Sequence, residues 1–200
     1  SGKTFPLSNV FPERLAQEQS LPVWLTEKLI AWQGKLGAEL VAKTFNQIPF
    51  VDLRVNRLRT TPETIKKVFE EAGMRTTLIK GCPDAIQVVS PIGDMREWPG
   101  YIDGYWCVQD RAAQWVSILL DPQPGERILD ACAAPGGKST HIAELMRNCG
   151  EIWAVDRSSK RLNRLGINAE RMGASCIRTL AADSSKLFLE KPSWRGSFQR

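Results

Sequence analysis

The sequence has few of the residues that build metal centres and catalytic triads. It holds one histidine, His141, which argues against a histidine metal cluster and against a serine–histidine triad. Its five cysteines are scattered without a Cys-x-x-Cys pair, so neither a zinc site nor a disulfide framework is expected. Unpaired cysteines are typical of a reducing compartment. We therefore expect no metal and a cytoplasmic location.

Long apolar runs and a strong charge bias are also missing. No stretch of 18 apolar residues occurs, and Ser1-Gly2-Lys3 does not resemble the start of a signal peptide. These absences predict a soluble protein without a membrane partner. The net charge of +5 is modest, so it permits a polyanionic partner without requiring one. With 42% hydrophobic residues, the chain of 200 residues can form one large or two small domains with packed cores.

The stretch from Arg127 to Thr140 predicts a ligand site. An apolar run that ends at Asp130 indicates a buried strand, Pro135-Gly136-Gly137 indicates a tight turn, and the residues that follow indicate a helix. Glycines let a ligand approach the backbone closely, and the first helical turn offers unpaired N–H groups. We therefore expect a cofactor at residues 132–138, which we call the glycine elbow.

Two cofactor classes are compatible with the glycine elbow. A phosphate-binding loop fits Gly137-Lys138-Ser139 but requires a glycine where Cys132 stands, so a nucleoside triphosphatase would have a degenerate loop. A nucleoside cofactor requires instead an acid at the end of the next strand to bind its ribose, and Asp156 follows Gly137 by nineteen residues. A third strand ends at Asp183. The spacing favours a nucleoside site along the carboxyl edge of a parallel sheet.

The ten residues from Asp130 to Ser139, with the sequence DACAAPGGKS, resemble the S-adenosylmethionine signature of the Sun/Fmu family of RNA cytosine-C5 methyltransferases. Short sequence motifs similar to those of this family occur in the same order at residues 22–25, 53–56, 99–101, 108–110 and 120–125. The resemblance runs from about Leu21 to Arg200 and is strongest to bacterial members that act on 16S ribosomal RNA. It implies S-adenosylmethionine as cofactor, ribosomal RNA as partner and methyl transfer to C5 of a cytosine. The cofactor-binding residues that it implies are Cys132, Ala133, Ala134, Pro135, Gly136, Gly137, Lys138, Asp156 and Asp183.

The resemblance also implies an α/β fold. We expect an incomplete Rossmann-like methyltransferase sheet with its first three parallel strands, preceded by a small α+β domain that is ferredoxin-like or RNA-recognition-like. Residues 1–20 are interpreted as a linker or the remnant of a preceding helical domain. Residues 21–104 are interpreted as a helical plus ferredoxin-like RNA-binding domain, and residues 105–200 as the N-terminal half of the methyltransferase domain.

Periodicity predicts the elements in more detail. Apolar residues recur at helical spacing from Pro22, and a second helix is expected over 35–45. Residues 50–58 alternate as a strand, Thr61 caps a helix that stops at Gly73, and short strands follow over 76–80 and 85–89. Residues 93–104 are expected as a loop, and residues 105–120 as a helix that packs against the sheet.

Basic residues give two candidate RNA contacts. The first group lies on strand 50–58 and just after it and consists of Arg54, Asn56, Arg57 and Arg59. The resemblance implies that these residues dock RNA, and a solvated strand face is the alternative. The helix after Asp156 carries a basic spread, for which a solvated face is the first interpretation and RNA contact the second. Its members are Arg157, Lys160, Arg161, Arg164 and Arg171. The aromatic signature of an RNA-recognition motif is lacking, so base stacking is not predicted.

Several site residues also have plainer interpretations. Asp130 can order the glycine elbow by accepting backbone hydrogen bonds, and Asp183 can cap a turn with Ser184 and Ser185 instead of contacting the adenine amino group. Cys132 is interpreted as a small filler, because no adjacent base is evident to activate it. Lys138 opposes the helix dipole, which suggests that it orients a group of the substrate or active site.

Methyl transfer to cytosine C5 requires a cysteine thiolate that adds to C6. The family carries its thiols in an Asp-Ala-Pro-Cys word after strand four and in a later Thr-Cys word, and neither occurs in this sequence. We therefore assign no catalytic residue and expect the chain alone to be inactive, with the rest of the domain as its missing partner. Residues 197–200 resemble the lead into strand four, without which the strand at 127–131 would be an unpaired edge. The alternative to a methyltransferase is a binding protein: a catalytically inactive fragment that binds RNA.

Overall fold

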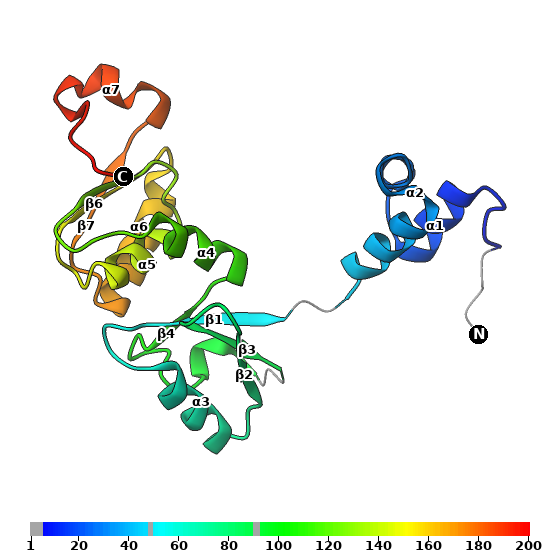
Figure 1. Cartoon of the computed structure of the whole chain (residues 1–200), viewed down its shortest axis with the longest axis horizontal. Helices are drawn as coiled ribbons and strands as arrows, with labels where there is room; N and C mark the ends of the chain where they lie inside the picture. Colours follow the sequence, from blue (N-terminus) through cyan, green and yellow to red (C-terminus); the bar gives the residue numbers. More distant parts are fainter. Residues whose placement is uncertain (1–5, 48–49, 90–92) are drawn as a thin grey trace. The chain divides into compact units, whose positions relative to one another are not determined.

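A computed structural model describes residues 6–47, 50–89 and 93–200 of the chain. The chain divides into two compact units, residues 1–49 and residues 50–200 (Figure 1). Within the described ranges, no helix combines the length and the apolar character needed to cross a bilayer.

The first unit consists of two helices, α1 (Phe11–Gln19) and α2 (Val23–Phe45). They enclose a small apolar core of Leu15, Leu29, Ala38 and Ala42. Gly34 interrupts α2 with a φ of 68°, so the helices expected from residue 22 and over 35–45 are both present. Helix α1 does not fit the interpretation of residues 1–20 as a linker, and the alternative, the remnant of a preceding helical domain, stays a prediction. Leu15 and Ala16 are buried and Phe11 packs against the same core, but three apolar residues in one short helix give only a weak periodic signal.

The second unit begins with a four-stranded antiparallel sheet in the order β2-β3-β1-β4. Its strands are β1 (Val51–Val55), β2 (Thr76–Leu78), β3 (Ala85–Val88) and β4 (Trp106–Val108). Helix α3 (Pro62–Glu71) starts at Thr61, whose hydroxyl accepts a hydrogen bond from the N–H of Thr64 at 3.2 Å, as predicted. The alternation in β1 places Leu53 and Val55 in the core with α3. This strand order is that of a ferredoxin-like domain, which confirms the predicted fold class.

The prediction of one helix over residues 105–120 is wrong in its first part. Residues 106–108 form β4, which pairs with β1, and helix α4 spans Arg111–Leu120. The Trp106 side chain is fully buried among aromatic rings and donates its indole N–H to the carbonyl of Pro99 at 2.8 Å. The tertiary contacts of this one side chain therefore override the helical pattern. Asp110 caps α4 by accepting from the N–H of Ala112 at 2.7 Å.

A three-stranded parallel sheet follows, in the order β5-β6-β7. Its strands are β5 (Arg127–Asp130), β6 (Glu151–Asp156) and β7 (Ile177–Ala181). Helices α5 (Gly137–Leu145) and α6 (Ser159–Met172) bury one face around Ile128, Ile152 and Leu165. The other face buries Val155 with Leu187 of α7 (Leu187–Glu190) and Trp194 of the 3₁₀ turn η3 (Pro192–Trp194). The 3₁₀ turn η2 (Ser184–Lys186) immediately precedes α7. A further 3₁₀ turn, η1 (Met95–Glu97), precedes β4. This is the expected start of a Rossmann-like sheet.

The last residues of the chain lie beside β5. The N–H of Gln199 donates to the carbonyl of Arg127 at 3.0 Å, and the N–H of Leu129 donates to the carbonyl of Arg200 at 3.1 Å. The Arg127 guanidinium also lies 4.8 Å from the centre of the Phe198 ring. The expectation of an unpaired edge at residues 127–131 is therefore corrected, because residues 199 and 200 already supply hydrogen-bond partners to two residues of β5.

Candidate functional site

The glycine elbow connects β5 to α5 and is held from both ends. Asp130 accepts a hydrogen bond from the hydroxyl of Ser139 at 2.7 Å and from the N–H of Cys132 at 3.3 Å. Gly136 adopts a φ of 104°, and a Cβ there would lie 2.5 Å from Cγ of Leu165. A side chain is thus excluded on two grounds, backbone conformation and space. Asp130 has the structural role that the sequence offered as its plainer interpretation.

Asp156 ends β6 and contacts the glycine elbow directly. One carboxylate oxygen accepts from the N–H of Ala134 at 3.3 Å, and the other accepts from the N–H of Ser158 at 2.9 Å. The hydrogen bond from Ser158, with the nearby Arg161 guanidinium, lowers the pKa of the Asp156 carboxyl below its usual value. A carboxylate offers about four acceptor positions. Two of them are therefore free to accept hydrogen bonds from a ligand.

Asp183 follows β7 and caps the turn after it. Its carboxylate accepts from the N–H of Ser185 at 3.0 Å, from the Ser185 hydroxyl at 2.7 Å and from Arg157 at 2.9 Å. These hydrogen bonds, led by the one from the Ser185 hydroxyl, lower the pKa of Asp183 to about 2. The capping role is thus present, although Ser184 donates instead to the carbonyl of Ala131. A contact with adenine stays a prediction and has about one acceptor position left to use.

Two pockets meet at the glycine elbow. The first, of about 440 Å³, is bounded by both aspartates and two basic residues of the β6–α6 region; its lining includes Cys132, Asp156, Arg157, Arg161, Asp183 and Ser184. The second, of about 230 Å³, is bounded by Val108, Gln109, Cys132, Pro135, Gly137 and Lys138, among others. The volume of the first falls in the range of ligand pockets, roughly 300–1,000 Å³.

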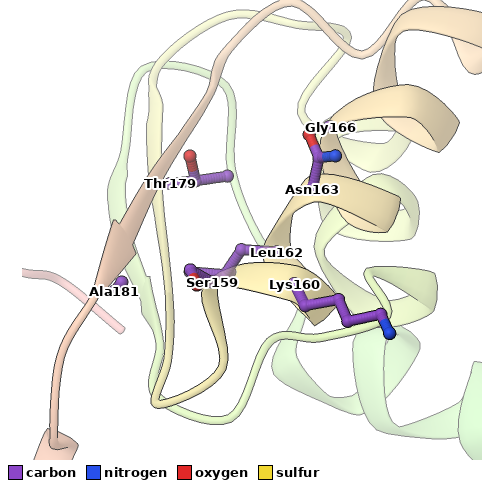
Figure 2. A pocket seen from close by; sticks show the side chains of 7 residues that line it. All are labelled: Ser159, Lys160, Leu162, Asn163, Gly166, Thr179 and Ala181. Carbon is purple, nitrogen blue, oxygen red and sulfur yellow. The ribbon is translucent and has the colours of Figure 1, made fainter.

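A larger pocket, of about 530 Å³, lies elsewhere on the second unit. Figure 2 shows its lining, in which Ser159, Leu162 and Asn163 of α6 face Thr179 and Ala181 of β7. It contains no carboxylate and none of the residues predicted to bind the cofactor. Size alone therefore does not identify the site, and the chemistry of the lining favours the pocket with Asp156 and Asp183.

Cys132 and Lys138 are both exposed at the elbow. Cys132 lines both pockets. In the part of the chain that the structure describes, no three histidine, cysteine or acidic side chains are grouped so that they could bind a metal ion. Lys138 lies in the first turn of α5 and lines the smaller pocket. Among the described residues no hydrogen bond or ion pair engages its ammonium group. Its predicted role in orienting a substrate group stays a prediction.

The predicted RNA-docking set on β1 is half wrong. Arg54 and Asn56 are completely buried, and the Asn56 amide donates to the carbonyls of Gly104 and Met172 at 2.8 and 2.7 Å. The polar side of β1 is covered by the second half of the unit, so it is not a solvated strand face either. Arg57 and Arg59 are exposed; Arg57 pairs with Asp84 at 3.4 Å, and Arg59 donates to the carbonyl of Asp103.

The basic spread on α6 is also partly structural. Arg161 donates to the carbonyl of Ala134 in the glycine elbow at 2.6 Å. Arg171 donates to the carbonyl of Tyr101 at 2.6 Å and lies over its ring. Arg157 binds Asp183, as described above. Lys160 and Arg164 are exposed and keep both of the interpretations that the sequence allowed.

Sequence reasoning missed the residues that bind Arg54. Its guanidinium forms an ion pair with Glu144 of α5, at 2.7 Å, and contacts Gln109 and Thr140. The alternation of β1 placed Arg54 on the polar side, and Gln109 belongs to a family-like word. No pattern in the sequence singles out Glu144, because an acid in the middle of an amphipathic helix is ordinarily solvated.

Comparisons with known proteins place both halves of the chain in one family. Residues 117–196 match the model described as 16S rRNA methyltransferase RsmB/F, and residues 21–94 match its ferredoxin-like domain. A probable ribosomal RNA small subunit methyltransferase B from Synechocystis is 39% identical over 178 residues, which is 89% of this chain and 40% of the relative. The Pseudomonas syringae protein named ribosomal RNA small subunit methyltransferase B is 37% identical over 177 residues, 87% of this chain and 39% of the relative. The chain thus spans about two fifths of these relatives.

Solved structures agree with the fold. The crystal structure titled PH0851 superposes with a TM-score of 0.84 and 32% identity over 92% of this chain and 41% of that chain. A methyltransferase homologue from Pyrococcus horikoshii superposes with a TM-score of 0.80 over 94% of this chain and 60% of that chain. At 22% identity, the second likeness shows the fold alone.

Proposed function

The chain belongs to the RsmB/F family of 16S rRNA methyltransferases, and from this premise we propose that it forms the RNA-docking and cofactor-binding part of an S-adenosylmethionine-dependent enzyme. The reaction proposed is methyl transfer to C5 of a cytosine in 16S ribosomal RNA, carried out in the cytoplasm. We assign no catalytic residue within this chain, and we expect the chain alone to be inactive on RNA.

The contact between Asp156 and the glycine elbow is the observation that supports the cofactor most strongly. The Asp156 carboxylate is anchored by two backbone N–H groups and keeps two acceptor positions, which is what a ribose with two vicinal hydroxyls requires. The carboxylate is ionised at neutral pH, and the hydrogen bond from Ser158 lowers its pKa further, so it accepts both hydrogen bonds in its stronger, charged form. A phosphate group would instead be repelled by this charge.

The remaining elbow residues suit the other parts of the cofactor. When bound, S-adenosylmethionine supplies an activated methyl group on a positively charged sulfur. The backbone of residues 132–137 would bind the amino-acid end at the N-terminus of α5, where unpaired N–H groups point outward. Asp183 would bind the adenine amino group with its remaining acceptor position. Lys138, at the rim of the smaller pocket, would orient a substrate group.

RNA docking is proposed on the exposed basic residues alone. Arg57 and Arg59 follow β1, and Lys160 and Arg164 lie on α6. Each lysine or arginine that neutralises a phosphate steepens the salt dependence of RNA binding. Replacing Arg57 and Arg59 with alanine should reduce that slope, measured by titrating a ribosomal RNA fragment at several salt concentrations. An unchanged slope would remove these two residues from the RNA surface.

Calorimetric titration with S-adenosylmethionine, and separately with ATP, tests the cofactor. We expect binding of S-adenosylmethionine and a loss of roughly tenfold or more in affinity for Asp156→Asn, because charged hydrogen bonds to the ribose are weakened. Asp121→Asn is the matched control, since Asp121 lies at the end of α4 in a left-handed conformation that asparagine also adopts. Binding of ATP without S-adenosylmethionine would instead favour a nucleoside triphosphatase.

A further inference from the structure

Arg54 uses its entire hydrogen-bonding capacity inside the protein. The guanidinium has five N–H donors, and the structure shows five hydrogen bonds. Nε and Nη2 bind the two carboxylate oxygens of Glu144 at 3.2 and 2.7 Å. Nη2 also donates to the hydroxyl of Thr140 at 2.9 Å, while Nη1 donates to the carbonyl of Gly137 at 2.6 Å and to Oε1 of Gln109. The side chain is completely buried.

Three of the four residues that accept these hydrogen bonds, Gly137, Thr140 and Glu144, lie on α5, whose first residues are the last residues of the glycine elbow. Gly137 is the first residue of α5, and its carbonyl accepts directly from Arg54. Thr140 relays the contact one residue further, because its hydroxyl accepts from Arg54 and lies 2.9 Å from the carbonyl of Gly136, to which it donates. Arg54 thus contacts, directly or through one hydroxyl, the two glycines that shape the elbow.

Arg54 also fixes the orientation of Gln109. Because Oε1 of Gln109 accepts from Arg54, its amide nitrogen is turned away from the guanidinium. That nitrogen is buried and has no hydrogen-bond partner among the described residues, while the Gln109 side chain lines the smaller pocket at the elbow together with Lys138. An unpaired buried donor beside a pocket is suited to an acceptor atom on a ligand.

Stability alone does not account for this arrangement. A buried ion pair contributes little over an apolar pair of the same volume, because desolvation offsets the attraction between the charges. A hydrophobic pair would join β1 to α5 at least as well. It would not bind the carbonyl of Gly137 or orient Gln109, so these contacts distinguish the arginine from an apolar residue.

We propose that Arg54 is a positioning residue through which the ferredoxin-like sheet holds the glycine elbow in its cofactor-binding shape. The inference rests on the proposed function, since it takes S-adenosylmethionine as the ligand of the elbow. Arg54 acts through Gly137, Thr140 and Gln109 and contributes no side-chain atom to the pockets. The two sheets therefore form one cofactor site instead of two independent modules.

The test separates positioning from simple stabilisation. In the 200-residue chain, Arg54→Met with Glu144→Met removes both charges and leaves no unpaired ion. We expect this double variant to fold, judged by circular dichroism and urea unfolding, and to bind S-adenosylmethionine roughly tenfold more weakly in calorimetry. A folded double variant with wild-type affinity would overturn the proposal. Wild-type chain that binds no S-adenosylmethionine would instead contradict the proposed function.

Two further variants keep the outcome decisive. Thr140→Val removes the relay to Gly136 at nearly constant volume, and we expect a several-fold weaker affinity with the fold intact; unchanged affinity would count against the proposal even if the double variant does not fold. The matched control is Asp52→Asn with Arg111→Met. Asp52 also lies on β1 and pairs with Arg111 of α4 at 2.6 Å, but neither residue contacts the elbow. This control should lower stability without changing the affinity.

Discussion

The two sheets of the second unit use their polar residues in opposite ways. On the antiparallel sheet, Arg54 and Asn56 are completely buried and every donor of both side chains has a partner within the protein. At the carboxyl edge of the parallel sheet, Asp156 and Asp183 line a pocket of about 440 Å³. A polar side chain on a strand is therefore structural where another element covers it, and available to a ligand where a pocket remains.

This difference follows from topology. The carboxyl ends of parallel strands leave a crevice that the connecting loops surround but do not fill. The polar face of β1 is covered instead, because α4 packs on it and Arg54 binds Gly137, Thr140 and Glu144 of α5. Buried polar groups there must satisfy one another, since an unpaired one is costly.

The largest expected effect is that of Arg54→Met on stability. The substitution leaves Glu144 buried without its partner, and we expect a loss of about 3–5 kcal/mol in the free energy of unfolding, measured with urea. Burial raises the pKa of the Glu144 carboxyl, which the Arg54 charge opposes. Without Arg54 the pKa rises further, so the loss should be greater at pH 8 than at pH 5, where the carboxyl can bind a proton. A loss below about 1 kcal/mol at pH 8 would contradict the structural role.

Asn56→Leu should have the next largest effect. The amide of Asn56 binds the carbonyls of Gly104 and Met172, and its oxygen accepts from the N–H of Leu58 at 3.0 Å. Leucine leaves these backbone groups unpaired, at a cost of about 1–3 kcal/mol or more in urea unfolding. The comparison is Asn163→Ala on the exposed face of α6, which should change stability by less than about 0.5 kcal/mol. Equal effects would mean that burial does not distinguish the two sites.

His141 is a completely buried residue of α5 and should give a smaller, pH-dependent effect. Burial lowers its pKa, and its Nε2 lies 3.8 Å from Asp84. The unfolded chain therefore binds a proton below about pH 6.5 that the folded chain resists, and stability should fall as the pH drops through that window. The slope approaches about 1.4 kcal/mol per pH unit at most. His141→Gln should flatten it in urea unfolding at pH 7 and pH 5.5; an unchanged slope would assign the acid sensitivity to other groups.

Asp183→Asn should have the smallest effect on stability and the clearest effect on binding. Asp183 is a partly exposed cap, and asparagine can keep its hydrogen bonds to Ser185. The urea midpoint should therefore fall only slightly at pH 7, because the lost ion pair with the exposed Arg157 contributes little, while the affinity for S-adenosylmethionine falls several-fold in calorimetry. Because the pKa of Asp183 is about 2, the wild-type pair with Arg157 persists until the pH falls below 4 and approaches that value. A loss of stability as large as that of Asn56→Leu would place Asp183 with the structural residues.

Much of the fold could be predicted from local signals. The cap at Thr61, the alternation of β1 and the strand–glycine–helix pattern at residues 127–140 depend on neighbouring residues, and the structure contains all three. The predictions that were wrong concern tertiary contacts. Residues 106–108 form a strand because Trp106 is buried, and α1 exists because α2 covers Leu15. The division between domains at residue 104 stays a prediction.

By itself, the sequence determined that a glycine turn follows the first parallel strand and that Asp156 ends the next one, because both depend on local chemistry with a fixed backbone geometry; that a cofactor binds there stays a prediction. Only the tertiary structure decided which polar residues are free to bind a ligand. Arg54 and Arg57 are the same residue type and lie three positions apart in the sequence, yet Arg54 is completely buried and Arg57 is exposed. The reason is physical: whether a charge meets water, a carboxylate or a ligand depends on the element that packs over it, and that element lies ninety residues away in the chain.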